Sequence, residues 1–290
     1  MSQSSYSLQV LPESRAALIP EALLNELAAT IERRTLMQFG AERRDLLINT
    51  LAGLADAAGM RDAGSYAGRL LSSGSETELM ALVDALTINE TTFFRNVPQL
   101  NMFAGFALPE VIARKRATSE PKRLKIWSAG CSTGQEAYTL AMLANEVVKP
   151  LFTWEAQILG TDISPTVLKA ARHGVYPKAR LDTMPTHMRA RYFDDLGAEI
   201  RVKESLRRLV TFKQHNLCES FPNDRFDVIF CRNVMIYFSR KEQARLAQRF
   251  AERLAPEGFL FIGHSESLQG LDVGLQLRLH NGGVAYQKEV

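Results

Sequence analysis

A segment rich in small residues, AGCSTG at positions 129–134, directly follows an apolar stretch of the chain. Small residues let the backbone approach a ligand closely, and glycines permit a sharp turn. The two glycines, Gly130 and Gly134, are spaced GxxxG, whereas a dinucleotide fingerprint is spaced GxGxxG. This spacing disfavours a nicotinamide oxidoreductase. By itself, however, a GxxxG segment is more often only a tight turn.

An acidic residue, Asp162, follows the next apolar stretch. A carboxylate at the end of a strand can accept hydrogen bonds from both hydroxyl groups of a ribose. The alternative is a helix N-cap, because Asp162 and Ser164 precede Pro165, which suits the first turn of a helix. In combination with the glycine turn, Asp162 favours an adenosine-containing cofactor.

Polar residues also follow the apolar stretch that ends near position 231. Arg232, Asn233 and Tyr237 lie in the segment FCRNVMIYF, at positions 230–238. Polar side chains at the end of a strand in a parallel sheet are usually functional, because ligands bind at that edge. For Tyr237 the alternative is an aromatic ring packed half-buried on the sheet.

A fourth polar cluster precedes all of these, in the segment NETTFFR at positions 89–95. Asn89, Thr91 and Arg95 surround the apolar pair Phe93 and Phe94. The alternative to a binding role is a capped helix start, with the two phenylalanines buried in a domain interface.

The hydrophobic pattern predicts the fold that positions these segments. Nearly continuous apolar strands alternate with amphipathic helices, which indicates an α/β fold with a parallel sheet covered on both faces. The dipeptide Asn281–Gly282 between two further strands is a hairpin signal, so we expect the last strand to be antiparallel. The pattern predicts strands at 123–128, 156–160, 208–213, 226–231, 258–263, 274–279 and 283–288, and helices at 135–148, 165–173 and 241–254.

The rest of the chain divides by composition. Residues 1–17 are rich in Ser and Gln and are expected to form a flexible tail. Apolar residues at helical spacing predict a small all-helical N-terminal domain at 18–88. We expect a linker and helix at 89–120 to contribute to the active site, and the main domain at 121–290 to carry a small insertion at about 190–207.

Bulk composition excludes several classes of protein. The net charge of the 290 residues is only +3, so nucleic acid is not an expected partner. The three cysteines form no CxxC pair, so we expect no metal site. No secretory signal and no stretch of about 20 apolar residues is present, which predicts a cytoplasmic protein without direct membrane insertion.

Four motifs, at 89–95, 129–138, 230–238 and 263–267 (GHSES), together resemble the CheR chemotaxis methyltransferases. The resemblance runs from about residue 18 to the C-terminus. It implies a Rossmann-like S-adenosylmethionine methyltransferase sheet, preceded by a helical domain and carrying a small β-subdomain. The implied reaction is methylation of glutamate side chains on the cytoplasmic helices of chemoreceptors (methyl-accepting chemotaxis proteins), giving glutamyl methyl ester and S-adenosyl-L-homocysteine.

The resemblance also implies roles for individual residues. Arg95 would position the substrate carboxylate and Tyr237 would lie beside the transferred methyl group. Glutamate has a pKa of about 4.3, so it is ionised near neutrality and needs no general base. We therefore expect no catalytic histidine, and His264 is expected to support the end of a strand. The residues implied around the cofactor are Asn89, Thr91, Arg95, Gly130, Glu136, Asp162, Asn216, Leu217, Arg232 and Asn233.

Two departures from the family concern its partners. Some members dock receptors through a basic helix face, but positions 49–56 here carry no positive charge. Arg43, Arg44, Arg61 and Arg69 are nearby substitutes. Some relatives tether a receptor-tail pentapeptide on the β-subdomain, which looks short here, so we expect no strong tether.

The alternative function is a module that senses the cofactor without transferring methyl groups.

Overall fold

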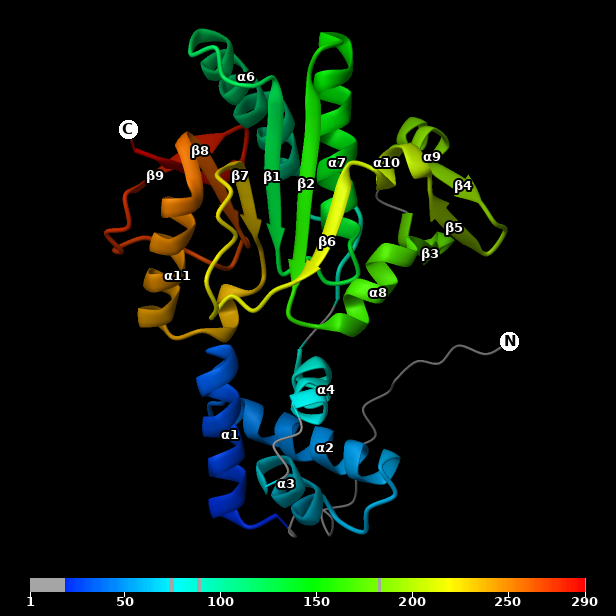
Figure 1. The fold of residues 1–290 in the computed structure, drawn as a ribbon, viewed down its shortest axis with the longest axis vertical. Helices are drawn as coiled ribbons and strands as arrows, with labels where there is room; N and C mark the ends of the chain where they lie inside the picture. Colours follow the sequence, from blue (N-terminus) through cyan, green and yellow to red (C-terminus); the bar gives the residue numbers. More distant parts are fainter. Residues whose placement is uncertain (1–18, 73–75, 88–89, 182–183, 290) are drawn as a thin grey trace. The chain divides into compact units, whose positions relative to one another are not determined.

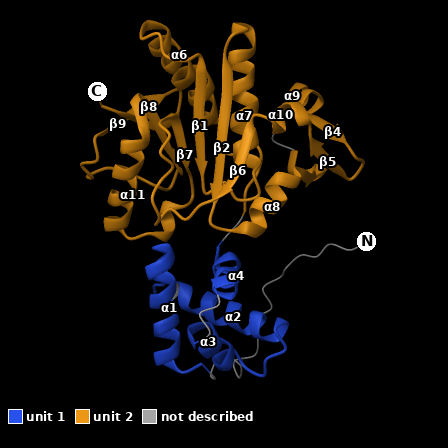
Figure 2. Ribbon diagram, in the orientation of Figure 1, with its two compact units in different colours: residues 1–88 blue, residues 89–290 orange. Residues whose placement is uncertain are grey.

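The computed structural model describes residues 19–72, 76–87, 90–181 and 184–289, and the chain forms two compact units, Met1–Ile88 and Asn89–Val290 (Figure 2). The expected tail at 1–17 lies outside the described residues. None of the helices within those four ranges is long and apolar enough to cross a membrane.

The first unit is helical in its described part. Leu27, Ile31, Leu51 and Leu82 are fully buried and form the centre of its core. The second helix ends before Gly59, whose φ of +67° is a left-handed conformation that suits glycine. The four helices are α1 (Glu21–Thr35), α2 (Ala41–Ala57), α3 (Ala63–Ser72) and α4 (Glu76–Leu86).

A seven-stranded sheet in the order β6-β2-β1-β7-β8-β10-β9 forms the centre of the second unit (Figure 1). The first five strands in this order are parallel, while β10 is antiparallel to both β8 and β9. The predicted α/β fold with an antiparallel last strand is therefore confirmed. The strands are β1 (Arg123–Ala129), β2 (Glu155–Asp162), β6 (Val210–Gln214), β7 (Phe226–Cys231), β8 (Leu254–Ile262), β9 (Leu275–His280) and β10 (Gly283–Lys288).

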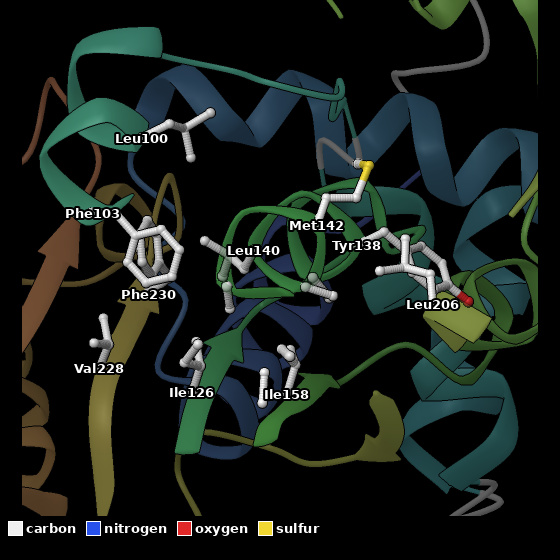
Figure 3. Close-up of a cluster of buried hydrophobic side chains, with 14 of the residues drawn as sticks. Leu100, Phe103, Ile126, Tyr138, Leu140, Met142, Ile158, Leu206, Val228 and Phe230 are labelled. Carbon is white, nitrogen blue, oxygen red and sulfur yellow. The ribbon is translucent and has the colours of Figure 1, made fainter. Parts of the chain in front are cut away.

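Helices cover both faces of this sheet. On one face, apolar residues of the strands and of several helical segments share one core, part of which is shown in Figure 3. On the other face, Phe250 of α11 (Arg240–Arg253) packs against Trp127 of β1, with ring centroids 5.0–5.3 Å apart among Trp127, Phe221 and Phe250. The segments on the first face are α5 (Val97–Met102), η2 (Phe103–Ala107), α6 (Leu108–Ala117), α7 (Gln135–Val148) and α8 (Pro165–His173).

A second, three-stranded antiparallel sheet in the order β3-β5-β4 forms the small β-subdomain. It includes more of the chain than the expected insertion at about 190–207, because β3 comes directly after α8 and pairs with β5. Its elements are β3 (Val175–Pro177), α9 (Thr186–Tyr192), β4 (Phe193–Asp195), β5 (Glu199–Val202) and α10 (Glu204–Arg207). The short helical turns η3 (Lys149–Leu151), η4 (Lys178–Leu181) and η5 (Met235–Tyr237) complete the unit.

A buried carboxylate near the amino end of β7, Asp227, joins the sheet to α6. It accepts hydrogen bonds from the Lys125 amide of β1 and from the Arg114 guanidinium, each at 2.8 Å, and its other cationic neighbour is the Lys115 ammonium at 2.9 Å. The Asp227 side chain is 2% exposed. Removing one partner of a buried ion pair leaves an uncompensated charge in a poorly solvated place.

We therefore expect Asp227→Ala to lower the free energy of unfolding of the second unit by about 3–5 kcal/mol. Both tryptophans, Trp127 and Trp154, lie in that unit, so their fluorescence during urea unfolding reports on it selectively. The matched control is Asp224→Ala, which removes the exposed partner of Lys125 and should cost less than about 1 kcal/mol. Equal losses in the two variants would contradict an anchoring role for Asp227.

Candidate active site

The turn between β1 and α7 begins the site at the carboxyl edge of the sheet. Gly130, Ser132 and Gly134 all have positive φ values, of 77°, 49° and 94°. The amides of Gly130 and Cys131 both donate to the Thr161 carbonyl, at 2.8 and 2.9 Å, which ties the turn to β2. A Cβ atom on Gly130 would collide with the Val234 side chain. Glycine is thus required at position 130 for both its conformation and its size.

Asp162, the last residue of β2, also contacts this turn. Its Oδ2 accepts a hydrogen bond from the Ser132 amide at 2.8 Å, and its Oδ1 accepts one from the Ser164 amide at 3.0 Å. The N-cap of α8 is Ser164, whose hydroxyl accepts from the Val167 amide at 3.2 Å. Of the two cap candidates in the sequence, Ser164 and not Asp162 is therefore the N-cap of α8. The two backbone amides thus hold the Asp162 carboxylate at the carboxyl end of β2.

The first turn of α7 carries Glu136, which bridges three parts of the site. Its Oε1 accepts a hydrogen bond from the Ser128 hydroxyl at 2.7 Å, and its Oε2 lies 3.5 Å from Nη1 of Arg232. Burial raises the pKa of Glu136, and the Arg232 charge opposes that rise. The two side chains are 15% and 4% exposed, so they form a partly desolvated ion pair.

Arg232 extends this connection to the segment at 90–96. Its Nη2 donates to the Arg95 carbonyl at 2.9 Å, while burial lowers its pKa and Glu136 raises it. The Arg232 Nε is buried and has no hydrogen-bond partner in the described part of the chain. An unsatisfied buried donor is costly, so this atom suits a bound ligand or an ordered water.

The segment at 90–96 forms a strained turn in the second unit. Phe94 has a φ of 53°, a rare conformation for an aromatic residue, and its amide donates to the Thr139 hydroxyl at 3.3 Å. Phe93 is fully buried against Tyr176 and Phe193 of the small β-subdomain, with ring centroids 5.1 and 5.3 Å apart. These contacts lie inside the second unit and join the segment to the small β-subdomain.

The polar residues of this segment differ in their exposure to solvent. The Arg95 side chain is exposed, and its Nη1 donates to the Glu90 carbonyl at 3.2 Å. Thr91 is half-buried, and Asn89 lies outside the described residues. The Arg95 backbone is therefore joined to the buried centre of the site, while its guanidinium stays accessible.

Two further segments complete the edge. After β6, the Asn216 side chain accepts a hydrogen bond from the Cys218 amide at 3.0 Å, and Leu217 is buried. After β7, Asn233 has a φ of 59°, and Tyr237 lies half-buried in η5. The carboxyl ends of β2, β1, β6 and β7 are neighbours because these strands are parallel, so the structure brings the candidate residues that follow these strands to one edge.

Two supporting residues have no signal in the sequence. The Tyr176 hydroxyl, from β3, donates to the Thr133 carbonyl at 2.7 Å and so holds the glycine turn. Arg249, from α11, donates to the Leu217 carbonyl at 2.5 Å and stacks over Phe221 at 3.9 Å. Both act on the site from elements that are distant in sequence, which is why local patterns did not reveal them.

Comparison with known proteins identifies the family. The family model described as "CheR methyltransferase, SAM binding domain" matches residues 89–278, which include the edge described above. A chemotaxis protein methyltransferase of Borreliella burgdorferi is 38% identical over 235 residues, which cover 79% of this chain and 83% of the relative. One of Salmonella typhimurium is 33% identical over 283 residues, covering 95% and 93%.

Solved structures resemble the chain more weakly. A class I S-adenosylmethionine-dependent methyltransferase of Listeria monocytogenes, described as putative in its name, covers 93% of this chain and 89% of its own, with 12% identity and a TM-score of 0.42. A likeness at this level adds nothing to the argument. The family match confirms the prediction from the four motifs: this chain is an S-adenosylmethionine-dependent methyltransferase and belongs to the CheR family.

Proposed function

We propose that this enzyme methylates glutamate side chains on the cytoplasmic signalling helices of chemoreceptors, giving glutamyl methyl esters. The printed names of its relatives, chemotaxis protein methyltransferases, support the receptor as the partner. The observation that carries the proposal is the Arg232 guanidinium, which contacts the Glu136 carboxylate at the glycine turn and the Arg95 carbonyl. Arg232 thus joins the proposed cofactor half of the site, which includes Glu136, to the proposed acceptor half, which includes Arg95.

The residues of the edge fit the cofactor. When bound, S-adenosylmethionine supplies a methyl group on a positively charged sulfur. We propose that Asp162 binds the ribose, that Asn216 and Leu217 contact the adenine, and that Glu136 faces the amino acid part. A Cβ atom at position 130 would collide with the Val234 side chain, so glycine there lets the turn keep the conformation in which its backbone approaches the cofactor. Asn89, Thr91, Arg95, Arg232 and Asn233 would complete the pocket.

The acceptor half needs only to orient a nucleophile that already exists. A glutamate carboxylate is ionised near neutrality, so no residue has to remove a proton. We propose that the exposed Arg95 guanidinium orients this carboxylate and that Tyr237 guides the reacting atoms. Because opposite charges neutralise each other as the methyl group moves, a dry and aligned site favours the reaction.

Receptor recognition through the first unit is proposed to differ from that of relatives with a basic docking helix. Positions 49–56 of α2 carry no positive charge. Two of the nearby arginines are already engaged within the unit: Arg44 pairs with Glu21 at 3.2 Å and Arg69 with Glu78 at 2.7 Å. Both ion pairs would have to be shared or exchanged on binding an acidic helix.

We expect only weak binding of a receptor-tail pentapeptide. The small β-subdomain has outer strands β3 and β4 of three residues each, and the turn between β4 and β5 contains only residues 196–198. A peptide that adds to a sheet edge gains affinity from backbone hydrogen bonds along that edge, and short strands offer few of them.

Mass spectrometry of a receptor cytoplasmic fragment, incubated with enzyme and S-adenosylmethionine, tests the proposed reaction. The expected product is a glutamate that has gained the mass of one methylene group and loses it again in mild base. Changing that glutamate to aspartate, which keeps the charge but moves the carboxylate, should reduce the yield. Cofactor binding without transfer to any receptor fragment would favour a sensing module instead.

Asp162→Ala should weaken cofactor binding by about 10- to 100-fold, because it removes a charged acceptor from the ribose and from the Ser132 amide together. Calorimetry with S-adenosyl-L-homocysteine measures this directly. Asp195→Ala is the matched control: this exposed carboxylate also accepts a backbone hydrogen bond, from Gly197 at 2.9 Å, but lies in the small β-subdomain. An unchanged dissociation constant for Asp162→Ala would exclude the proposed ribose contact.

Arg95→Ala should reduce kcat/KM for the receptor fragment by about 100-fold or more, because the acceptor carboxylate loses its charged partner. The contact to Arg232 uses the Arg95 carbonyl and survives the substitution. Tyr237→Phe should lower kcat at saturating cofactor. Arg123→Ala, at the amino end of β1, is the control arginine. If turnover stayed at the wild-type rate in both site variants, the proposed roles would be wrong.

A further inference from the structure

The segment at 232–237, here called the 232–237 loop, carries three of the residues assigned above: Arg232, Asn233 and Tyr237. It leaves β7 through Asn233, whose left-handed φ of 59° is unusual outside glycine, and enters the single helical turn η5. The first amides of a helical turn have no partner within the turn. The loop therefore needs an external hydrogen-bond acceptor to keep this conformation.

The Glu266 carboxylate is that acceptor. Its Oε2 accepts a hydrogen bond from the Asn233 amide at 3.2 Å, and its Oε1 accepts one from the Ile236 amide at 3.1 Å. The Gly263 amide, at the end of β8, also donates to Oε2. One side chain thus binds backbone donors from two chain segments that follow neighbouring strands.

The environment of Glu266 strengthens this arrangement. Burial raises the pKa of Glu266, whereas hydrogen bonds from the amides of Gly263, Ile236, Asn233 and Met235 lower it. Hydrogen bonds to a charged acceptor are about twice as strong as neutral ones. The half-buried carboxylate and the loop amides therefore stabilise each other, and removing either partner leaves the other unsatisfied.

Glu266 is itself held in place. The Arg240 guanidinium of α11 donates to the carbonyls of Ser267 and Gln269, and the Leu268 amide donates to the Tyr286 hydroxyl at 3.0 Å. A Cβ atom on Gly263 would lie 2.7 Å from Glu266 Oε2 and 3.0 Å from the Asn233 amide. Glycine at 263 therefore lets the carboxylate reach the loop.

We propose that Glu266 is a positioning residue for methyl transfer, which sets the conformation of the 232–237 loop and thereby the placement of Tyr237. This inference rests on the proposed function for its effect on rate. Arg232 has separate contacts to Glu136 and to the Arg95 carbonyl, so its position depends less on Glu266. Loss of Glu266 should therefore reduce turnover more than cofactor affinity.

Hydrogen exchange of the full-length protein tests the loop directly and requires no activity. Glu266→Gln places an amide group among backbone donors, so amides at 233–237 should exchange at least about tenfold faster, which corresponds to a loss of about 1.4 kcal/mol of protection. Asp227→Asn is the matched control, because it neutralises another carboxylate that accepts a backbone amide. It should leave exchange in the loop unchanged.

Kinetics with the receptor fragment test the effect on rate. Glu266→Gln should lower kcat by about 10- to 100-fold, as expected for a small misplacement of a reacting group, with less than about a threefold change in affinity for S-adenosyl-L-homocysteine. Gly263→Ala keeps the carboxylate and its charge but displaces it, so it should lower kcat in the same direction. Asp227→Asn, compared at a temperature where circular dichroism shows it folded, should keep the wild-type kcat.

The outcomes separate the two proposals. A wild-type enzyme that transfers no methyl group refutes the proposed function, while the exchange experiment still decides whether Glu266 holds the loop. Unchanged loop exchange in Glu266→Gln refutes the positioning role whatever the activity. Faster loop exchange with wild-type kcat in both Glu266→Gln and Gly263→Ala would show that the loop is held but does not limit transfer, and would also overturn the inference.

Discussion

The contact between the buried Arg232 guanidinium and its acceptors is the interaction on which the site depends. Two charges lose solvation when they are buried, and only close partners compensate for this. Here the Glu136 carboxylate and the Arg95 carbonyl are those partners, and together with Arg232 they come from three separate segments of the chain. Because both groups contact Arg232, the first turn of α7, the end of β7 and the turn at 90–96 are held together. The site thus exists only when all three segments are in place.

Carboxylates that accept backbone amides have different consequences at the two edges of the sheet. At the amino edge, Asp227 accepts the Lys125 amide and neutralises two cations of α6, which connects a helix to the sheet. At the carboxyl edge, Asp162 and Glu266 accept amides from segments with positive φ values, at Ser132 and Asn233. Such conformations cost on the order of 1–3 kcal/mol each and persist only where the surroundings over-determine them.

The proposed function assigns the chemistry and the choice of substrate to different parts of this protein. The second unit contains the family-matched region and every described residue assigned to cofactor or acceptor. The proposed methylation of a carboxylate needs alignment and exclusion of water rather than an acid or base, so few residues would carry the reaction itself. Under this proposal the charge of the first unit, as at positions 49–56, can change while the reaction stays the same.

The sequence alone determined the helices and strands, the glycine turn and the place of Asp162 at the end of a strand. Apolar periodicity and turn residues involve only a few neighbouring positions. The strands, the Asn281–Gly282 hairpin and the family motifs could therefore be predicted from the sequence. Tertiary structure alone decided which carboxylate oxygen meets which amide. It assigned the α8 cap to Ser164, extended the small β-subdomain back to β3, and brought Tyr176, Arg249 and Glu266 to the site. The Ser164 cap is a local contact, whereas the others join residues far apart in the chain, and no local pattern encodes them.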